Sequence, residues 1–375
     1  MIRKEKIKYF HHHVQERILI KIFLQVILFC SFILLVSCFS PIDRNTNSTL
    51  DLNQDYFVII NSLSNNFSVY SVSDNLMTKD FKNILEDSGS NAAPNEILSA
   101  DNRLFVINSL DNSLSVFDFQ LGFREKISLG SGKNPYSLAY DSVNKRILIT
   151  DFTAQSFDVI DISDTDHIML DRTIAVTGSV TPQGVSVTQD YVLISDINLI
   201  GSTTYGDADL YVYDRNTLSF LYKKTLSGVI NVQKIRTKET DNQVDVIATG
   251  DYEHTYGSVF RYNIAAGDMT EIAELDLDST NDFYLDYYYD SLNDLVYITG
   301  VNTLYSYKQS GFDQWEKIKT LQDATYLTGV LITNQYALIL AGTENKFYMV
   351  DLNTKEVILE TETGFWPCDL VFLSL

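Results

Sequence analysis

From Tyr56 onward the hydrophobic residues of this chain come in short runs rather than at helical spacing. Val, Ile, Leu, Phe and Tyr make up the runs, and Asn, Asp, Ser and Gly separate them. This alternation of short apolar segments and turn-forming residues is typical of closely spaced β-strands. No stretch of twelve or more residues has convincing helical periodicity.

The apolar runs occur in pairs, and the pair recurs seven times. Residues 105–108 with 114–118, and 147–150 with 157–161, are clear examples. Equivalent positions in the second run of each pair are spaced by 43 to 53 residues: Val69, Val116, Val159, Val212, Phe260, Tyr305 and Met349. A period of about 40 to 50 residues with four short strands per unit indicates a propeller. We therefore predict an all-β fold, a seven-bladed β-propeller over residues 56–375.

The two ends of the repeated region complement each other. The first unit opens at Phe57 with its second strand, and residues 364–375 repeat a first strand with no second strand after it. We predict that the C-terminal strand completes the N-terminal blade. This closure would leave no blade with an unpaired inner edge.

Residues 103–118, together with 127–130 and 134–139, resemble the YVTN-type repeats of surface-layer and YncE-like propellers. The resemblance is clear over the second to fourth units and looser from Val229 onward. It implies a propeller fold and a location outside the cytoplasm. It implies no particular activity, because propellers carry many unrelated functions.

Residues 1–37 have the order of a bacterial signal peptide. A basic stretch that includes Arg3 and Lys21 precedes an apolar run over 22–36, which is short for a membrane-spanning helix and is interrupted by Gln25 and Ser31. The run ends in Leu35-Val36-Ser37-Cys38, which resembles a lipobox, so we predict that Cys38 is lipidated. An uncleaved transmembrane anchor is the alternative.

Residues 38–55 are predicted to be the lipidated cysteine and a flexible tether, because Ser, Asn, Thr and Asp dominate them without apolar periodicity. Phe39 is not the Asp that retains some lipoproteins at the inner membrane, so the predicted location is the outer membrane of the cell envelope. Without residues 1–37 the chain has 22 Lys and Arg against 47 Asp and Glu, a formal charge of −25. Such a surface repels nucleic acid and favours cationic or neutral partners.

The sequence offers no motif for a cofactor and no assignable catalytic residue. Of the three cysteines only Cys38 and Cys368 follow the signal peptide, so acylation of Cys38 leaves no disulfide. His167 and His254 lie in different units without metal-ligand spacing. The acidic segment 276–282 lacks the Gly and the final Glu of an EF-hand, so we interpret it as a solvated turn and predict no metal site.

Polar residues at the starts of the predicted inner strands would line the central channel. They are Asn95, Glu96, Asn134, Tyr136, Gln183, Asp282, Tyr284 and Asp369. Propeller lactonases and lyases place their reactive groups in this channel. An enzyme of that kind, with a divalent metal held by channel carboxylates, is therefore the alternative to a binding function.

The main functional hypothesis is a membrane-anchored binding module with a protein, peptide or glycan partner. In a four-stranded blade, the second-to-third and blade-to-blade connections emerge on one face, and the longest loops of this chain fall there. Aromatic and acidic residues in these loops suit such a partner. The candidate binding residues are Tyr205, Asp207, Tyr252, Glu253, Tyr256, Asp276, Asp278, Asp282, Tyr284 and Trp366.

Replacing Cys38 with Ala tests the predicted anchor. Without the thiol that accepts the diacylglycerol, the chain should be neither lipidated nor cut by the lipoprotein peptidase. Detergent phase partitioning and the mass of the mature protein measure both steps. A C38A protein that is processed and partitions as the parent does would contradict the lipoprotein prediction.

Overall fold

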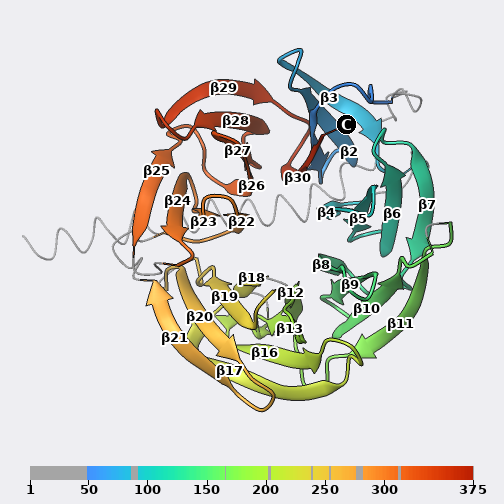
Figure 1. Cartoon of the computed structure of the whole chain (residues 1–375), viewed down its shortest axis with the longest axis vertical. Helices are drawn as coiled ribbons and strands as arrows, with labels where there is room; N and C mark the ends of the chain where they lie inside the picture. Colours follow the sequence, from blue (N-terminus) through green and yellow to red (C-terminus); the bar gives the residue numbers. More distant parts are fainter. Residues whose placement is uncertain are drawn as a thin grey trace, which may run out of the picture. The chain divides into compact units, whose positions relative to one another are not determined.

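The computed structural model describes residues 49–85, 92–164, 166–201, 204–237, 240–252, 255–275, 282–310 and 314–374. These residues form strands and turns, with no helix long and apolar enough to cross a membrane among them. Seven four-stranded antiparallel sheets form a ring around a central channel (Figure 1), so the predicted seven-bladed β-propeller is confirmed. A further two-stranded ribbon pairs β14 (Leu199–Ile200) with β15 (Thr204–Tyr205). The predicted signal peptide over residues 1–37 and the predicted lipidation site Cys38 lie outside the described residues.

The blades are numbered in chain order, and their strands run from the channel outward. Blade 1 contains β30 (Pro367–Leu373), β1 (Tyr56–Asn61), β2 (Asn66–Ser71) and β3 (Leu76–Asn83). Blade 2 contains β4 (Pro94–Ala100), β5 (Arg103–Asn108), β6 (Ser113–Asp118) and β7 (Phe123–Ser128). Blade 3 contains β8 (Pro135–Asp141), β9 (Arg146–Asp151), β10 (Ser156–Asp161) and β11 (Met169–Ala175).

The other four blades follow the same order. Blade 4 contains β12 (Pro182–Val187), β13 (Tyr191–Asp196), β16 (Asp207–Asp214) and β17 (Phe220–Ile230), with β14 (Leu199–Ile200) and β15 (Thr204–Tyr205) inserted between β13 and β16. Blade 5 contains β18 (Val232–Thr237), β19 (Gln243–Ala248), β20 (Ser258–Ile264) and β21 (Met269–Leu275). Blade 6 contains β22 (Asp286–Asp290), β23 (Leu295–Thr299), β24 (Thr303–Lys308) and β25 (Trp315–Thr320). Blade 7 contains β26 (Leu327–Thr333), β27 (Tyr336–Ala341), β28 (Lys346–Asp351) and β29 (Glu356–Glu362).

The composition of each strand follows its distance from the channel. Strands β1 and β9 are buried along their whole length, because neighbouring blades cover both faces of the sheet at this position. The outermost strand β29 instead alternates exposed and half-buried residues, with Glu356, Glu360 and Glu362 on its exposed side. Charged residues on an edge strand oppose pairing with another chain.

The antiparallel order gives the propeller two different faces. The connections between the second and third strands, and those between blades, emerge on what we call the loop-rich face. The connections between the first and second strands, and between the third and fourth, emerge on the short-turn face. Each innermost strand therefore begins at the loop-rich face and ends at the short-turn face.

The ring closes by pairing the two ends of the propeller. Strand β30 pairs antiparallel with β1, with Val58 opposite Val371 and Ile59 opposite Leu370. β30 also contacts β26 of blade 7 and β4 of blade 2. The predicted completion of the N-terminal blade by the C-terminal strand is confirmed.

The chain joins the propeller at the short-turn face, and it does so a few residues before β1 begins. Leu50 is buried in the core between blades 1 and 2, and its N–H donates to the carbonyl of Gln120 at 3.2 Å. Gln120 lies in the turn between β6 and β7, which belongs to the short-turn face. The last residues of the predicted tether are thus part of the folded domain.

Deleting residues 364–375 tests how much the closure contributes. The deletion removes the buried side chains of Leu370, Val371 and Leu373 and exposes the inner edge of β1. Each large apolar side chain contributes about 1.5–3 kcal/mol on burial, and a domain is stable by only about 5–15 kcal/mol, so the loss should approach the whole stability. Thermal unfolding and solubility of the truncated protein measure it. A soluble protein that melts at the parental temperature would show that closure is dispensable.

Candidate functional site

One position of each innermost strand contributes to a ring of seven residues in the central channel, which we call the channel ring. The strand register makes these positions equivalent: Glu96 lies opposite Ile107, Lys234 opposite Ile247 and Asp369 opposite Ile60. In blade order from blade 1 the ring is Asp369, Glu96, Ser137, Gly184, Lys234, Asp286 and Gly329. Three carboxyl groups and one ammonium group thus lie at one level of the channel.

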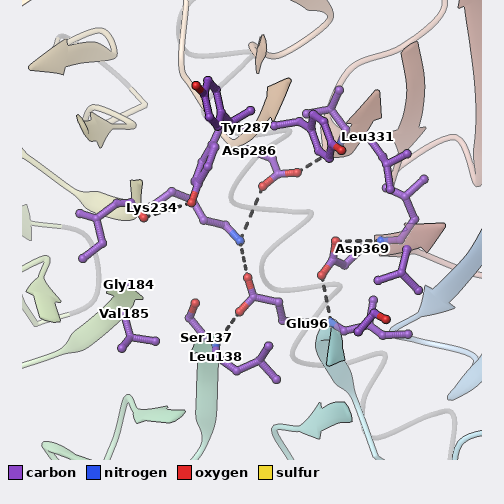
Figure 2. Close-up of a pocket in the computed structure, with 18 of the residues that line it drawn as sticks. Glu96, Ser137, Leu138, Gly184, Val185, Lys234, Asp286, Tyr287, Leu331 and Asp369 are labelled. Atoms are coloured by element: carbon purple, nitrogen blue, oxygen red, sulfur yellow. Dashed lines mark hydrogen bonds and ion pairs between the residues drawn. The ribbon is translucent and has the colours of Figure 1, made fainter. Parts of the chain in front are cut away.

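Lys234 connects two of the carboxylates across the channel (Figure 2). Its Nζ lies 3.0 Å from Oε1 of Glu96 and 3.6 Å from Oδ1 of Asp286. Lys234 belongs to blade 5 and Glu96 to blade 2, so the pair joins opposite sides of the ring. Asp369 makes no ion pair with any described residue.

Each carboxylate also accepts a backbone N–H from the next blade. The N–H of Leu138 donates to Glu96 at 2.7 Å, that of Ile97 to Asp369 at 2.9 Å, and that of Val330 to Asp286 at 3.0 Å. An innermost strand has no further strand on its channel side, so these bonds satisfy N–H groups that would otherwise lack a partner. The carboxylates therefore join neighbouring blades as well as lining the channel.

The protonation of the channel ring follows from burial and from mutual charge. Burial disfavours the charged form of Lys234, but Glu96, Asp286 and Asp369 outweigh this and hold the pKa of its ammonium group well above the usual value. Burial, together with the charges of Glu96 and Asp286, raises the pKa of Asp369 to about 8. Burial also raises the pKa of Asp286, although Lys234 opposes the shift. Asp369 is thus a neutral hydrogen-bonding acid at neutral pH, and Lys234 is a cation.

A cavity of about 580 Å³ begins at this ring. Its wall includes one residue from every blade, each directly after the channel ring position: Ile97, Leu138, Val185, Ile235, Tyr287, Val330 and Leu370. We call these seven residues the apolar belt. Farther along the strands Ser99, Tyr289 and Phe372 also line the cavity. Because innermost strands run toward the short-turn face, the cavity extends from the charged ring toward that face.

Above the channel ring, at the loop-rich end, tyrosines cross the channel. The hydroxyl of Tyr136 donates to Oε1 of Gln233 at 3.2 Å, and Nε2 of Gln233 donates to the hydroxyl of Tyr252 at 3.1 Å. Tyr252 is hydrogen-bonded in turn to Tyr326. This tyrosine bridge links blades 3, 5 and 7. Burial raises the pKa of Tyr326 to about 12, so the bridge consists of neutral phenols at physiological pH.

The aromatic residues predicted for the loop-rich face lie around this bridge. The rings of Tyr252 and Tyr256 contact Phe283, with centroids 5.3 and 5.5 Å away, and Trp366 contacts Tyr326 at 6.1 Å. Tyr205 lies in β15 and is half-buried. The structure therefore brings aromatic side chains of four sequence-predicted positions to one end of the channel.

Not every predicted binding residue is available at the surface. Asp207 is exposed, and its side chain accepts a hydrogen bond from the N–H of Gly228 at 3.0 Å.

Two other predicted binding residues are buried. Asp282 accepts hydrogen bonds from the N–H of Val301 and the hydroxyl of Tyr305, both at 2.8 Å. Tyr284 is only 1% exposed. Asp282 and Tyr284 precede β22, which begins at Asp286, and both are buried in the core. Glu253, Asp276 and Asp278 lie outside the described residues.

The donors near the channel do not form a metal-binding set. Among the described residues, no three or more His, Cys, Asp or Glu side chains are gathered closely enough to hold a metal ion. The ammonium group of Lys234 already lies between Glu96 and Asp286. Burial raises the pKa of Cys368 well above its usual value, so this thiol stays protonated and unreactive.

Sequence reasoning found Glu96 and Asp369 but missed Lys234 and Asp286. Both missed residues lie in blades 5 and 6, where the repeat is looser and the proline at the start of the innermost strand is absent. Aligning 232–235 and 284–287 with 94–97 would have placed both at the position of Glu96. The useful signal was therefore the register of the first strand, which the apolar pattern alone does not give.

Comparison with known proteins identifies the fold. No family profile matches the sequence, and no curated protein is a significant match by sequence. Among solved structures, a candidate 6-phosphogluconolactonase from Bacteroides fragilis superimposes with a TM-score of 0.64 and 14% identity, over 86% of this chain and 98% of that one. A protein from Lactobacillus plantarum gives 0.63 and 13% over 85% and 99%, and virginiamycin B lyase from Staphylococcus aureus gives 0.59 and 12% over 76% and 92%. At these identities the likeness shows the propeller fold.

Replacing Asp369 with Asn tests the charge balance of the ring. In the native state Asp369 keeps its proton up to about pH 8, whereas its ordinary pKa is 3.8. Between these values the native state holds more protons than the unfolded chain, so this group lowers the stability as pH rises from about 4 to about 8. Asn cannot ionise, so the free energy of unfolding should fall less in D369N than in the parent over this pH range. The difference between the two decreases should be on the order of a few kcal/mol.

Urea unfolding at pH 4.5, 6.5 and 8.5 measures this effect. Asp166→Asn, at an exposed turn position, is the matched control and should unfold in parallel with the parent at all three values. Asp286 shifts in the same direction, so part of the slope should remain in D369N. Parallel curves for D369N and the parent would show that Asp369 is ionised in the native protein.

Proposed function

We propose that this protein is a lipid-anchored binding module of the bacterial envelope, with a protein or glycan partner at the loop-rich face. The observation that carries the proposal is the collection of aromatic side chains from blades 1, 4, 5, 6 and 7 around the loop-rich end of the channel: Trp366, Tyr205, Tyr252, Tyr256, Phe283 and Tyr326. Such side chains combine apolar area with polar tips, and they dominate the energetics of many interfaces.

Backbone conformation supports a role for this collection beyond packing. Tyr252 has φ +63° and Trp366 has φ +60°, both in the left-handed region that bulky residues avoid. Holding such a residue there costs on the order of 1–3 kcal/mol, and such costs concentrate at functional sites. They are the two aromatic residues with positive φ among those that the structure describes.

The charge of the chain favours a cationic or neutral partner. Asp207 is exposed and Asp251 is half-buried on the loop-rich face, and the chain after residue 37 has a formal charge of −25. Complementary charge speeds the encounter between partners and improves its specificity. The anchor itself rests on the lipobox-like segment that ends at Cys38 and on the apolar run before it.

A channel hydrolase or lyase is the second candidate. Asp369, with its pKa of about 8, lies near Glu96 in the cavity, and a neutral acid beside a carboxylate is the usual arrangement for general acid–base catalysis. The donor set does not fit the divalent metal expected for that alternative. A lactone substrate panel tests it: hydrolysis that disappears in D369N would favour the enzyme over the binding module.

Paired substitutions test the loop-rich face. Replacing Tyr205 and Tyr256 with Ala should lower partner capture at least fivefold, because Tyr256 is 42% exposed and Tyr205 is half-buried near Asp251 of the same loop as Tyr256. The control replaces Val143 and Leu292 with Ala on the short-turn face, which are 69% and 94% exposed. Capture from envelope extracts and binding to a glycan array are the measurements. Equal losses in both double variants would refute this assignment of the face.

A further inference from the structure

The channel cavity differs from the loop-rich face in its chemistry and in the face toward which it extends. Its volume of about 580 Å³ lies within the range of small-molecule sites. Its charged end is the channel ring, its wall is the apolar belt, and it extends toward the short-turn face. The tyrosine bridge lies on the other side of the channel ring. This cavity and the aromatic side chains at the loop-rich end of the channel are therefore two separate sites. A ligand that fits the cavity has a polar head and a compact apolar body.

The balance of charge decides which polar head fits. The ring has three carboxyl groups and a single ammonium group, and Lys234 is already paired with Glu96 and Asp286. Among described residues, Asp369 has only backbone hydrogen bonds, from the N–H of Ile97 and its neighbour Leu370. An anionic head would meet these carboxyl groups without a free cation to pair with. A cationic head would find a carboxyl group without an ion pair at the ring, and the apolar belt along part of the cavity wall.

We propose that this cavity binds a small organic cation, an ammonium group on an apolar skeleton, with the ammonium group at Asp369 and Glu96 and the skeleton against the apolar belt. A bare metal ion would make no use of the belt, and the ring does not gather its donors as metal ligands. The aromatic ring of Tyr287 in the belt adds a surface that cations favour. The proposal does not rest on a partner at the loop-rich face.

Binding of a cation at this position is linked to release of a proton. The charged or titratable groups that influence Asp369 are Glu96 from β4, Asp286 from β22 and Lys234 from β18, with Cys368 beside it on β30. A cationic ligand adds a positive charge to this set and lowers the pKa of Asp369 from about 8, so its proton passes to solvent. Affinity for the cation therefore increases as the pH rises toward 8.

Calorimetric titration of the full-length protein in detergent micelles tests the proposal, with empty micelles as the blank. The probes are cyclohexylamine, cyclohexanecarboxylate, cyclohexanol and methylamine, which separate the charge from the apolar body. Cyclohexylammonium should bind at least tenfold more tightly than the other three probes. Its affinity should be three- to tenfold higher at pH 8.5 than at pH 6, and the measured heat should depend on the buffer because a proton is released.

Three variants locate the site. D369N should weaken cyclohexylammonium binding about tenfold and abolish its pH dependence. If D369N does not fold, Glu96→Gln should still weaken binding and should move the pH dependence to lower pH, because the charge of Glu96 helps to raise the pKa of Asp369. Ser99→Trp should block the cavity near the short-turn face without touching the charged ring, because Ser99 is exposed and lines the cavity. Tyr256→Ala at the loop-rich face is the control and should bind the amine as the parent does.

Several results would overturn the proposal. One is the absence of cyclohexylammonium binding at 10 mM, a concentration on the order of the weakest useful affinities. A second is binding of cyclohexanecarboxylate as tight as that of cyclohexylammonium. A third is unchanged cyclohexylammonium binding in both D369N and S99W. Loss of amine binding in Y256A would move the site to the loop-rich face. Failure of the partner-capture experiment would leave these results unaffected, so the two proposals can fail separately.

Discussion

The pairing of β30 with β1 is the interaction on which the rest of the propeller depends. Each blade is buried on both faces only because another blade lies on either side, and β1 is buried along its whole length for that reason. The last blade can cover the first only if the C-terminal strand occupies the innermost position of blade 1. The channel ring depends on the same pairing, because it is β30 that brings Asp369 beside Glu96 and within reach of the N–H of Ile97.

The channel ring shows how one set of residues both lines a cavity and joins the blades around it. Seven equivalent positions could each have carried a small neutral residue, as Ser137, Gly184 and Gly329 do. At Gly184 even a single added carbon would lie 2.7 Å from the hydroxyl oxygen of Ser195 and 3.0 Å from the backbone carbonyl oxygen of Gln233, so the neighbouring strands leave no room there. The charged residues occupy the remaining positions, where three carboxylates bind backbone N–H groups of the next blade. Lys234 pairs with Glu96 and Asp286, and the proton that Asp369 keeps at neutral pH limits the repulsion among the three carboxyl groups.

The sequence was sufficient for the fold because a propeller repeats its signal. Seven copies of the same pair of apolar runs predict the number of blades, and the unpaired strand at 364–375 predicts the closure. The site was harder to predict, since a register shift near the start of six of the seven innermost strands, all but β22, sets which side chain faces the channel. A shift of two or four residues moves the prediction from Asp286 to Tyr284 and Asp282, which do not line the channel cavity. Hydrogen bonds among Tyr136, Gln233 and Tyr252 join three segments far apart in the chain, and no local pattern encodes them.

The position of Leu50 has a consequence for how the protein would be oriented in the envelope. The chain enters the folded domain at the short-turn face, where Leu50 bonds to Gln120. Cys38 precedes Leu50 by twelve residues, and twelve extended residues span at most about 40 Å. If Cys38 carries the acyl chain that we propose, this length sets an upper limit of about 40 Å on the distance between the lipid anchor and Leu50. The segment that follows the anchor would then join the propeller at the short-turn face, on the side toward which the channel cavity extends, and the aromatic side chains of the loop-rich face would lie at the opposite end of the channel.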